Sequence, residues 1–312
     1  MTSIGLRPLK VGLFLPLWEE STRGRVPPWT EVLERAQAAE AVGFDSLWVP
    51  DHLILRFPDT ETEGVWEGWS ILAALAAVTG RVELGQLVTC TAFRNPALLA
   101  KMADTVDEIS GGRLTLALGA GWHEPEFQAF GYPFDRRVSR FEEAVTIIHG
   151  LLKQGQIDFE GTYYQARDCE LRPRGLRPAG PPIMIGGSGP RMLGLTARFA
   201  DVWSRDFNEV NPGHPPYSPE DLAAWLPRVD TACAEVGRDP ATLERTAAVL
   251  VDLPIVSGRE GWDALTGSPD ALAEGLRGYA RAGFSHVQVW LEPSTTAGIQ
   301  AFAPVLELLD GG

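Results

Sequence analysis

The sequence predicts a single (β/α)8 barrel that spans residues 1–312, and three observations support this fold class. The length of 312 residues suits one barrel of about 250 residues with insertions. Eight short apolar runs alternate with longer helical patterns, as in parallel α/β architectures. No GxGxxG motif follows the first apolar run, so a dinucleotide-binding doubly wound sheet is the weaker alternative.

Each predicted strand is a short apolar run that is bounded by glycine, proline or polar residues. In chain order, the predicted strands cover residues 10–17, 45–49, 82–89, 113–118, 182–185, 201–203, 244–252 and 286–291.

Each predicted helix carries its apolar residues mainly on one face. Glycine follows the first and third helices at Gly43 and Gly111, and Pro96 stands where the third helix begins, as is usual at helix boundaries. In chain order, the predicted helices cover residues 29–42, 69–78, 96–110, 138–153, 191–200, 219–236, 270–282 and 296–309.

Residues from about 155 to 181 interrupt the alternation of predicted strands and helices after the fourth helix. The segment IDFEGTYYQARDCEL alternates in polarity around a glycine, which predicts a β-hairpin, and a loop rich in Pro, Arg and Gly follows it. We interpret the segment as an insertion in one barrel. A second, proline-rich loop is predicted over residues 209–219.

Composition and charge exclude several classes of protein. The net charge of −14 argues against nucleic-acid binding and against an anionic membrane surface. The N-terminus has no signal-peptide pattern and no apolar run approaches about 20 residues, so we expect a cytoplasmic protein. The cysteines Cys90, Cys169 and Cys233 are odd in number and widely spaced, which predicts neither a disulfide framework nor a zinc site.

The segment GFDSLWVPDHL, residues 43–53, places Asp51 and His52 at the C-terminal end of the second strand. In this fold that end of the barrel carries the active site. Histidine exchanges protons near neutral pH, so we predict that His52 and Asp51 are catalytic. The alternative is that Asp51 caps the following turn and His52 is structural.

Two further segments follow the third and fourth strands. Thr89 and Cys90 can hydrogen-bond to a planar ligand or pack on it, although a free cysteine is more often a small buried apolar group. Gly119, Ala120 and Gly121 permit close approach of the backbone to a ligand. The alternative is a turn that needs positive φ angles only.

The segment PPIMIGGSGPRML, residues 181–193, ends the fifth strand in four small residues before Pro190. Exposed amides at the N-terminus of a helix bind anions, so Gly187, Ser188 and Gly189 predict a phosphate site. The alternative is a flexible tight turn.

Several tryptophans lie near predicted strand ends or in the loops that follow them. Each one alone is best explained by packing, but together they predict an aromatic-walled pocket for a flat or apolar ligand. They are Trp48, Trp66, Trp69, Trp122 and Trp203.

Taken in order, these segments resemble the luciferase-like monooxygenase superfamily, and within it the class of F420-dependent oxidoreductases. The resemblance covers residues 10–205. For the rest of the chain, only the alternation of predicted strands and helices supports it. It rests on GFDSLWVPDH, RVELGQLVTCTAFRNPALLAKMADTVDEISGGRLTLALGAGW, RFEEAVTIIHGLL, FEGTYYQ and PPIMIGGSGPRMLGLTARFADVW.

The resemblance implies a flavin or 5-deazaflavin that lies across the strand ends. It implies that Asp51 and His52 are the family's aspartate–histidine pair, and that the turn at Gly187, Ser188 and Gly189 holds the cofactor phosphate. A bulge in the third strand, often with a non-proline cis peptide that supports the ring, falls on Leu87 and Val88. Cys90, Ala120 and Gly121 complete the predicted cofactor contacts.

One departure limits the resemblance. The related sugar-phosphate dehydrogenases have a glutamate after the glycines of the fourth strand, and this sequence has Trp122 at that position. Glu124 and Glu126 are near, but nothing in the sequence places them. We therefore do not predict oxidation of a sugar phosphate.

The leading hypothesis is an enzyme that transfers a hydride between reduced coenzyme F420 and a small organic substrate. The second is an FMN-dependent monooxygenase that uses oxygen and reduced flavin, supplied by a separate reductase. The third is a flavin-binding or storage barrel without catalysis. A metal-dependent barrel ranks last, because the five histidines form no HxH or HxxxH cluster. The sequence leaves open whether the protein forms a homodimer.

Overall fold

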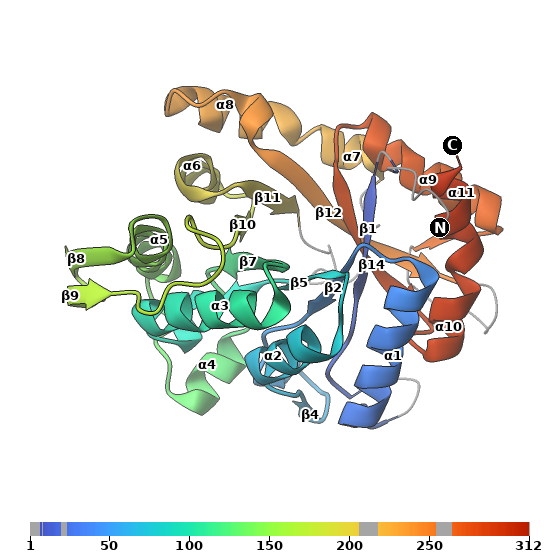
Figure 1. Ribbon diagram of the computed structural model, residues 1–312, viewed down its shortest axis with the longest axis horizontal. Coiled ribbons are helices and arrows are strands. Elements are labelled where there is room, and N and C mark those ends of the chain that lie inside the picture. Colours follow the sequence, from blue (N-terminus) through green and yellow to red (C-terminus); the bar gives the residue numbers. More distant parts are fainter. Residues whose placement is uncertain (1–6, 8, 20–23, 206–217, 254–263, 312) are drawn as a thin grey trace.

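The computed structural model describes residues 7, 9–19, 24–205, 218–253 and 264–311. Its main feature is a closed ring of eight parallel strands, in which each strand pairs with the next and the last pairs with the first (Figure 1). The predicted (β/α)8 barrel is therefore confirmed. In order around the ring, the strands are β1 (Lys10–Phe14), β2 (Ser46–Val49), β5 (Glu83–Gln86), β7 (Leu114–Gly119), β10 (Ile183–Gly186), β11 (Val202–Arg205), β12 (Glu244–Asp252) and β14 (His286–Glu292).

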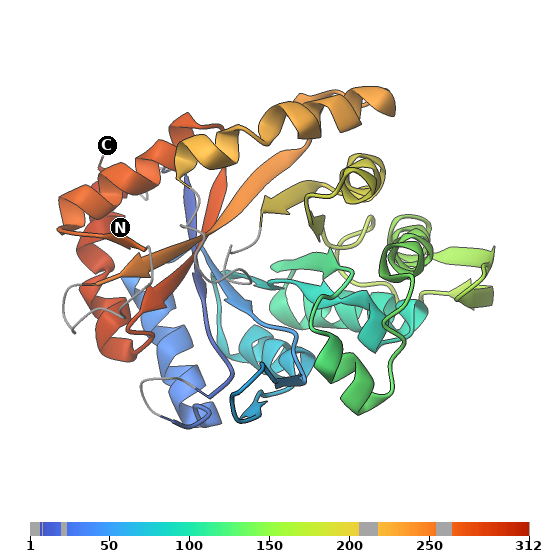
Figure 2. The same ribbon diagram turned by 180° about the vertical axis from the view of Figure 1, so that it is seen from behind.

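Helices surround this ring on its outer side, as both views of the molecule show (Figures 1 and 2). Their ends follow the capping signals in the sequence. The side chains of Glu67 and Asn95 accept amide hydrogen bonds at the starts of the second and third helices, and Gly43 and Gly111 end the first and third helices in the left-handed conformation. The main helices between Trp29 and Arg281 are α1 (Trp29–Val42), α2 (Gly68–Val78), α3 (Pro96–Ser110), α5 (Arg137–Gln154), α6 (Pro190–Phe199) and α9 (Pro269–Arg281).

Side chains along each barrel strand alternate between two cores. Outward residues such as Leu13 and Val289 pack against the helices. Inward residues such as Phe14 and Trp290 form a smaller cluster inside the ring. Trp48 belongs to this inner cluster and is 1% exposed.

Two glycines make room for the Trp48 ring. A Cβ atom at Gly12 or at Gly85 would collide with the indole. Trp48 therefore fills the interior below the strand ends, as a packed barrel core requires. Its Nε1 donates a 2.7 Å hydrogen bond to Ser46 Oγ, which lies 2.8 Å from Nε2 of the buried His286.

The hairpin predicted within residues 155–181 is present. Strands β8 (Gln156–Glu160) and β9 (Gln165–Glu170) pair antiparallel and project from the outside of the barrel beside α5 (Figure 1). The segment after the hairpin is attached to α3 by Arg177, whose Nε donates a 2.8 Å hydrogen bond to the buried Asp107.

The third strand differs from its predicted extent of residues 82–89. Strand β5 ends at Gln86, and the short β6 (Thr89–Cys90) pairs with β7. The peptide bond between Leu87 and Val88 is cis, which confirms that prediction.

Two helices that were predicted as continuous are broken, so those predictions were wrong. Residues 219–236 form α7 (Pro219–Ala223) and α8 (Leu226–Glu235), and residues 296–309 form α10 (Thr296–Ala301) and α11 (Ala303–Asp310). A proline, Pro227 or Pro304, stands in the first turn of each second helix, where its missing N–H interrupts the hydrogen-bond ladder.

Several short elements were not predicted. They include α4 (Glu124–Phe130), the paired strands β3 (Ile54–Leu55) and β4 (Glu63–Gly64), and β13 (Leu265–Thr266), which pairs with β12. The proline-rich loop predicted over 209–219 lies mostly outside the described residues. No helix in the described part of the chain is long and apolar enough to cross a membrane.

Candidate active site

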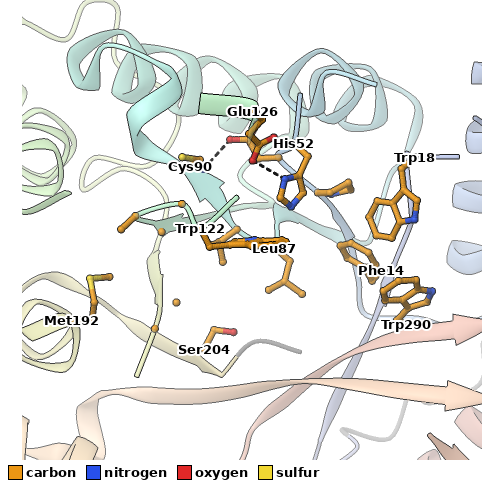
Figure 3. Close-up of a pocket in the computed structure, with 18 residues that line it drawn as sticks. Phe14, Trp18, His52, Leu87, Cys90, Trp122, Glu126, Met192, Ser204 and Trp290 are labelled. Carbon is orange, nitrogen blue, oxygen red and sulfur yellow. Dashed lines mark hydrogen bonds and ion pairs between the residues drawn. The ribbon is translucent and has the colours of Figure 1, made fainter. Parts of the chain in front are cut away.

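A cavity of about 290 Å³ opens where the barrel strands end (Figure 3). Its walls come from the C-terminal ends of β1, β2, β5, β7, β10, β11 and β14 and from the loops that follow them. The position agrees with the place of active sites in this architecture.

His52 and Glu126 form a hydrogen-bonded pair at the cavity wall. His52 follows β2, Glu126 lies on α4, and His52 Nδ1 is 2.9 Å from Glu126 Oε1. The Leu53 amide donates a 2.9 Å hydrogen bond to the other carboxylate oxygen. The second ring nitrogen of His52 points away from Glu126 and into the cavity (Figure 3). His52 therefore offers one nitrogen to a ligand while the other is fixed by a carboxylate.

Two aromatic side chains from the loop after β7, Trp122 and His123, contact the His52 ring. The Trp122 ring meets His52 edge to face at 5.6 Å and is 41% exposed at the cavity rim. His123 accepts the Arg56 amide at 2.9 Å through Nε2, and burial lowers the pKa of His123. His123 is thus held by the protein as a neutral acceptor, whereas His52 faces the cavity.

Asp51 lines the cavity, but its carboxylate is bound by other protein groups. Arg94 donates two hydrogen bonds to it, of 2.7 and 2.8 Å, and the Cys90 amide donates a third of 2.8 Å. Arg94 also donates to Glu67 at 2.7 Å. Burial opposes the charge of Arg94, but Asp51 and Glu67 outweigh this effect and raise its pKa. The Asp51 carboxylate therefore holds Cys90 and Arg94, and with them the loop after β6, in place.

The third and fourth strands supply an uncharged wall. Leu87, Val88 and Cys90 line the cavity, as do Gly119, Ala120 and Gly121. Burial raises the pKa of the Cys90 thiol, so it stays protonated and acts as a small apolar group.

Two of these glycines are required by close packing. A Cβ atom at Gly119 would lie 2.6 Å from Val88 Cγ2, and one at Gly121 would lie 2.7 Å from Cys90 Sγ. Gly121 also has a φ of +76°, which favours glycine.

The predicted phosphate turn is only partly at the cavity. Gly187 lines it together with Gly186, whereas Ser188 and Gly189 lie beyond the lining, at the start of α6. Gly189 is the N-cap of α6, and nothing lies within 4 Å of a Cβ atom built there. A side chain at Gly189 would therefore meet no neighbouring atoms.

Ser204 on β11 contributes a buried polar group to the cavity. The residue is 1% exposed, and its Oγ has no hydrogen-bond partner among the described residues. A buried hydroxyl without a partner costs free energy, which is recovered when a ligand or water binds it.

The predicted aromatic-walled pocket is present, but largely different residues build it. Of the five tryptophans singled out in the sequence, Trp122 lines the cavity, and Trp48 lies deeper in the barrel. The aromatic side of the cavity consists of Phe14, Trp18 and Trp290. Phe14 and Trp290 occupy inward positions at the ends of β1 and β14, so period-two alternation was the signal that could have identified them.

Glu126 and Ser204 were also not assigned a role from the sequence. Glu126 is 2% exposed and lies 74 positions from His52, on a short helix that was not predicted. No local pattern connects the two residues, because their contact depends on the barrel bringing the loops after β2 and β7 together.

Comparison with known proteins identifies a matching family model and several relatives of the chain. A family model described as luciferase-like monooxygenase matches residues 9–253. A phthiodiolone/phenolphthiodiolone dimycocerosates ketoreductase of Mycobacterium sp. (strain JLS) is 32% identical over 236 residues, which are 69% of this chain and 60% of that protein. The chain thus spans less than two thirds of the length of this relative.

Two further matches cover more of the chain. A pyrimidine monooxygenase of Cronobacter turicensis is 28% identical over 329 aligned positions, covering 97% of this chain and 84% of that protein. Among solved structures, an F420-dependent secondary alcohol dehydrogenase in complex with an F420–acetone adduct superposes with a TM-score of 0.80 at 21% identity. That match covers 96% of this chain and 99% of the other, and it shows a shared fold.

Proposed function

The chain belongs to the luciferase-like monooxygenase family, and from this premise we propose that it transfers a hydride between reduced coenzyme F420 and a small organic substrate. The observation that carries the proposal is the His52–Glu126 pair, which presents one imidazole nitrogen to the cavity (Figure 3). Hydride transfer to an uncharged acceptor leaves negative charge on the substrate, and a proton donor at that place lowers the barrier.

Names of relatives support the reaction type. The mycobacterial relative is a ketoreductase, and the superposed alcohol dehydrogenase is named for dependence on F420. Both names describe oxidation or reduction at a carbonyl or alcohol carbon. We transfer this chemistry to the present chain as part of the proposal.

The cavity has features that fit a planar cofactor. Gly119, Ala120 and Gly121 line the cavity beside Leu87 and Val88, and these residues together give a flat ring an uncharged wall to lie against. The unpartnered Ser204 hydroxyl offers a hydrogen bond to a polar ring edge. When bound, the deazaflavin would supply or accept the hydride.

The cofactor phosphate is assigned to the start of α6. The first amides of a helix lack partners inside the helix and carry the positive end of its dipole. In our proposal Gly187, Ser188 and Gly189 bring the phosphate to these amides without side-chain obstruction.

Each polar residue then has a separate task. His52 gives or takes the proton through Nε2, which makes it the catalytic residue. Glu126 is a positioning residue, because it holds the imidazole through Nδ1. Asp51 also becomes a positioning residue, since Arg94 and the Cys90 amide occupy its carboxylate.

The second candidate is an FMN-dependent monooxygenase that uses oxygen. The pyrimidine monooxygenase relative, which aligns along 97% of the chain, supports it. In that case a separate reductase would supply the reduced flavin. A homodimer stays a prediction under either function.

Cofactor titration under controlled oxygen distinguishes these candidates. Purified protein is titrated with reduced coenzyme F420 and with reduced FMN, and turnover is followed by absorbance with and without oxygen. We expect tight binding of F420 and substrate-dependent oxidation without oxygen. Oxygen-dependent turnover confined to FMN would replace the first function by the second. Tight binding with no turnover under any condition would indicate a storage barrel.

A further inference from the structure

A short hairpin lies between two segments that each contribute a tryptophan to the cavity. It consists of β3 and β4, which pair antiparallel over two residues each, and we call residues 54–64 the rim hairpin. Val65, directly after it, pairs with Trp18 of the cavity wall. An isolated two-stranded hairpin is marginally stable in water, so the rim hairpin depends on contacts with its surroundings.

His123, in the loop after β7, makes two contacts with the rim hairpin. The Arg56 amide donates a 2.9 Å hydrogen bond to its Nε2. The Phe57 ring packs on the His123 ring, with centroids 5.2 Å apart, and lies nearly parallel to the ring of Trp122 at 6.4 Å and 27°. Trp122 lines the cavity, so the rim hairpin is attached to the segment that carries a residue of the cavity wall.

The bond between Arg56 and His123 fixes the protonation state of the imidazole. A backbone amide only donates, so Nε2 must offer a lone pair and the proton of the neutral ring is on Nδ1. Protonation would place a second N–H on Nε2, opposite the Arg56 N–H. The hydrogen bond therefore exists only while His123 is neutral.

The surroundings of His123 also favour the neutral ring. Burial is the largest effect and lowers the pKa of His123, which is 4% exposed. The charged groups that face it are Glu126 on α4, which raises this pKa, and His52 and Arg56, which lower it. A histidine that is released to water has a pKa of about 6.5. Acid therefore shifts the equilibrium from the attached hairpin toward the released one.

We propose that His123 is a pH-dependent anchor of the rim hairpin. The neutral ring holds the hairpin against the loop after β7. Protonation releases the hairpin and moves the Phe57 ring away from Trp122 at the cavity. This inference goes beyond the proposed function, because it concerns the wall of the cavity and holds for any cofactor or substrate.

The first test follows hydrogen exchange of the Arg56 amide by mass spectrometry with residue resolution. Protection factors at pH 7.5 and pH 5.5 remove the intrinsic pH dependence of exchange. We expect the wild type to lose about three- to tenfold of its protection at the lower pH, since a released histidine takes up a proton in this range. His123→Gln, whose side-chain oxygen accepts the amide at both pH values, should change by less than about twofold.

Two controls assign the response to His123. His149→Gln removes another histidine whose pKa is lowered by burial, on α5, and should behave like the wild type. The Leu53 amide, which donates to Glu126 at 2.9 Å, is an internal reference near the hairpin. Unchanged protection of Arg56 in the wild type overturns the inference. An equal loss in the wild type and in His123→Gln also overturns it, and a parallel loss at Leu53 would then indicate the His52–Glu126 pair.

The second test removes the acceptor at constant pH. His123→Phe keeps a ring for Phe57 but has no acceptor, so its hairpin should be released at pH 7.5. Trypsin cleaves after Arg56, and the rate of this cut is measured from the peptides formed. We expect it to be about three- to tenfold faster in His123→Phe than in the wild type and in His123→Gln. Thermal unfolding first confirms that each variant is folded. Equal rates in folded proteins would show that His123 does not hold the hairpin, which overturns the inference.

Discussion

His52 Nδ1 lies 2.9 Å from Glu126 Oε1, and the second oxygen of Glu126 accepts the Leu53 amide at 2.9 Å. Both carboxylate oxygens are thus fixed, one by the side chain of His52 and one by the backbone that follows it. This arrangement sets which imidazole nitrogen is offered to the cavity. The role of Glu126 can therefore be tested by substitution in the same way as the role of His52.

Replacing Glu126 by Gln should impair turnover although the shapes of the two side chains are alike. The Leu53 amide needs an acceptor, so the new amide group would direct its NH2 toward His52 Nδ1 and require that nitrogen to be unprotonated. His52 could then no longer carry protons on both nitrogens. We expect turnover to fall by about 10²–10⁴-fold with unchanged cofactor affinity, measured by steady-state kinetics and titration. Glu124→Gln, at an exposed position on the same helix, is the control.

His52→Ala should retain the fold and cofactor binding but lose turnover by about 10²–10⁴-fold. The reason is that the substrate oxygen would lose its proton donor. Melting temperature, cofactor affinity and turnover per folded molecule separate this outcome from a structural role. A variant that melts lower but turns over like the wild type would show that His52 is structural. His149→Ala serves as a control on α5, where the ring packs on Phe199.

Gly189→Val tests the phosphate site more cleanly than a change at Gly187. Gly187 has a φ of +132°, so any side chain there strains the backbone. Gly189 has a φ of −64° and open space around its Cβ position. We expect Gly189→Val to weaken cofactor binding with little change in melting temperature. An unchanged dissociation constant would remove the phosphate from this turn.

The buried His286 should make stability depend on pH. Burial lowers its pKa from 6.5 to about 3, so the unfolded chain takes up a proton more readily than the folded protein does. Above pH 6.5 this residue does not reduce the free energy of unfolding. As pH falls from 6.5 toward 3, protonation of His286 in the unfolded chain lowers that free energy. Between pH 7 and pH 5 the loss is about 2 kcal/mol.

Urea unfolding of the wild type and of His286→Gln at both pH values measures this difference. The variant is expected to be less stable at pH 7 but to lose about 2 kcal/mol less on acidification. Parallel pH dependence in the two proteins would mean that His286 is not the group responsible.

Gly85→Ala should destabilise the barrel, because its Cβ would collide with the buried Trp48 ring. Overpacking of this kind costs about 1–3 kcal/mol. Gly80→Ala is the matched control, since nothing lies within 4 Å of its Cβ position. Chemical denaturation of both variants checks the expectation, and equal stabilities would show that the ring moves aside without cost.

The barrel was predictable because its signals are local. Runs such as residues 182–185 are apolar and short, and α1 and α3 have the predicted bounds because glycine ends both helices and a proline starts α3. Broken helices were harder to predict, since Pro227 and Pro304 fall inside segments whose apolar pattern continues across them.

Residues of the cavity wall were predictable where they lie within three positions of a strand end, as His52 and Gly187 do. It was not predictable where two distant segments meet. Glu126 lies after Pro125 in a segment that resembles a loop, and its partner comes from the loop after a different strand. Phe14 was missed because the first strand was predicted to continue to residue 17, which hid it as the last inward residue of the strand.

The pairing of β1 with β14 closes the ring, and it can form only after the last barrel strand has been synthesised. The segments that carry His52, Glu126 and Gly187 are synthesised well before Trp290, and segments of a protein can begin to fold during synthesis. Until β14 inserts between β12 and β1, both neighbouring strands present open edges, which are prone to pair with other chains. A chain that stalls before this strand therefore leaves Phe14 beside the open edge of β1, even though the segments that carry His52, Glu126 and Gly187 have already been made.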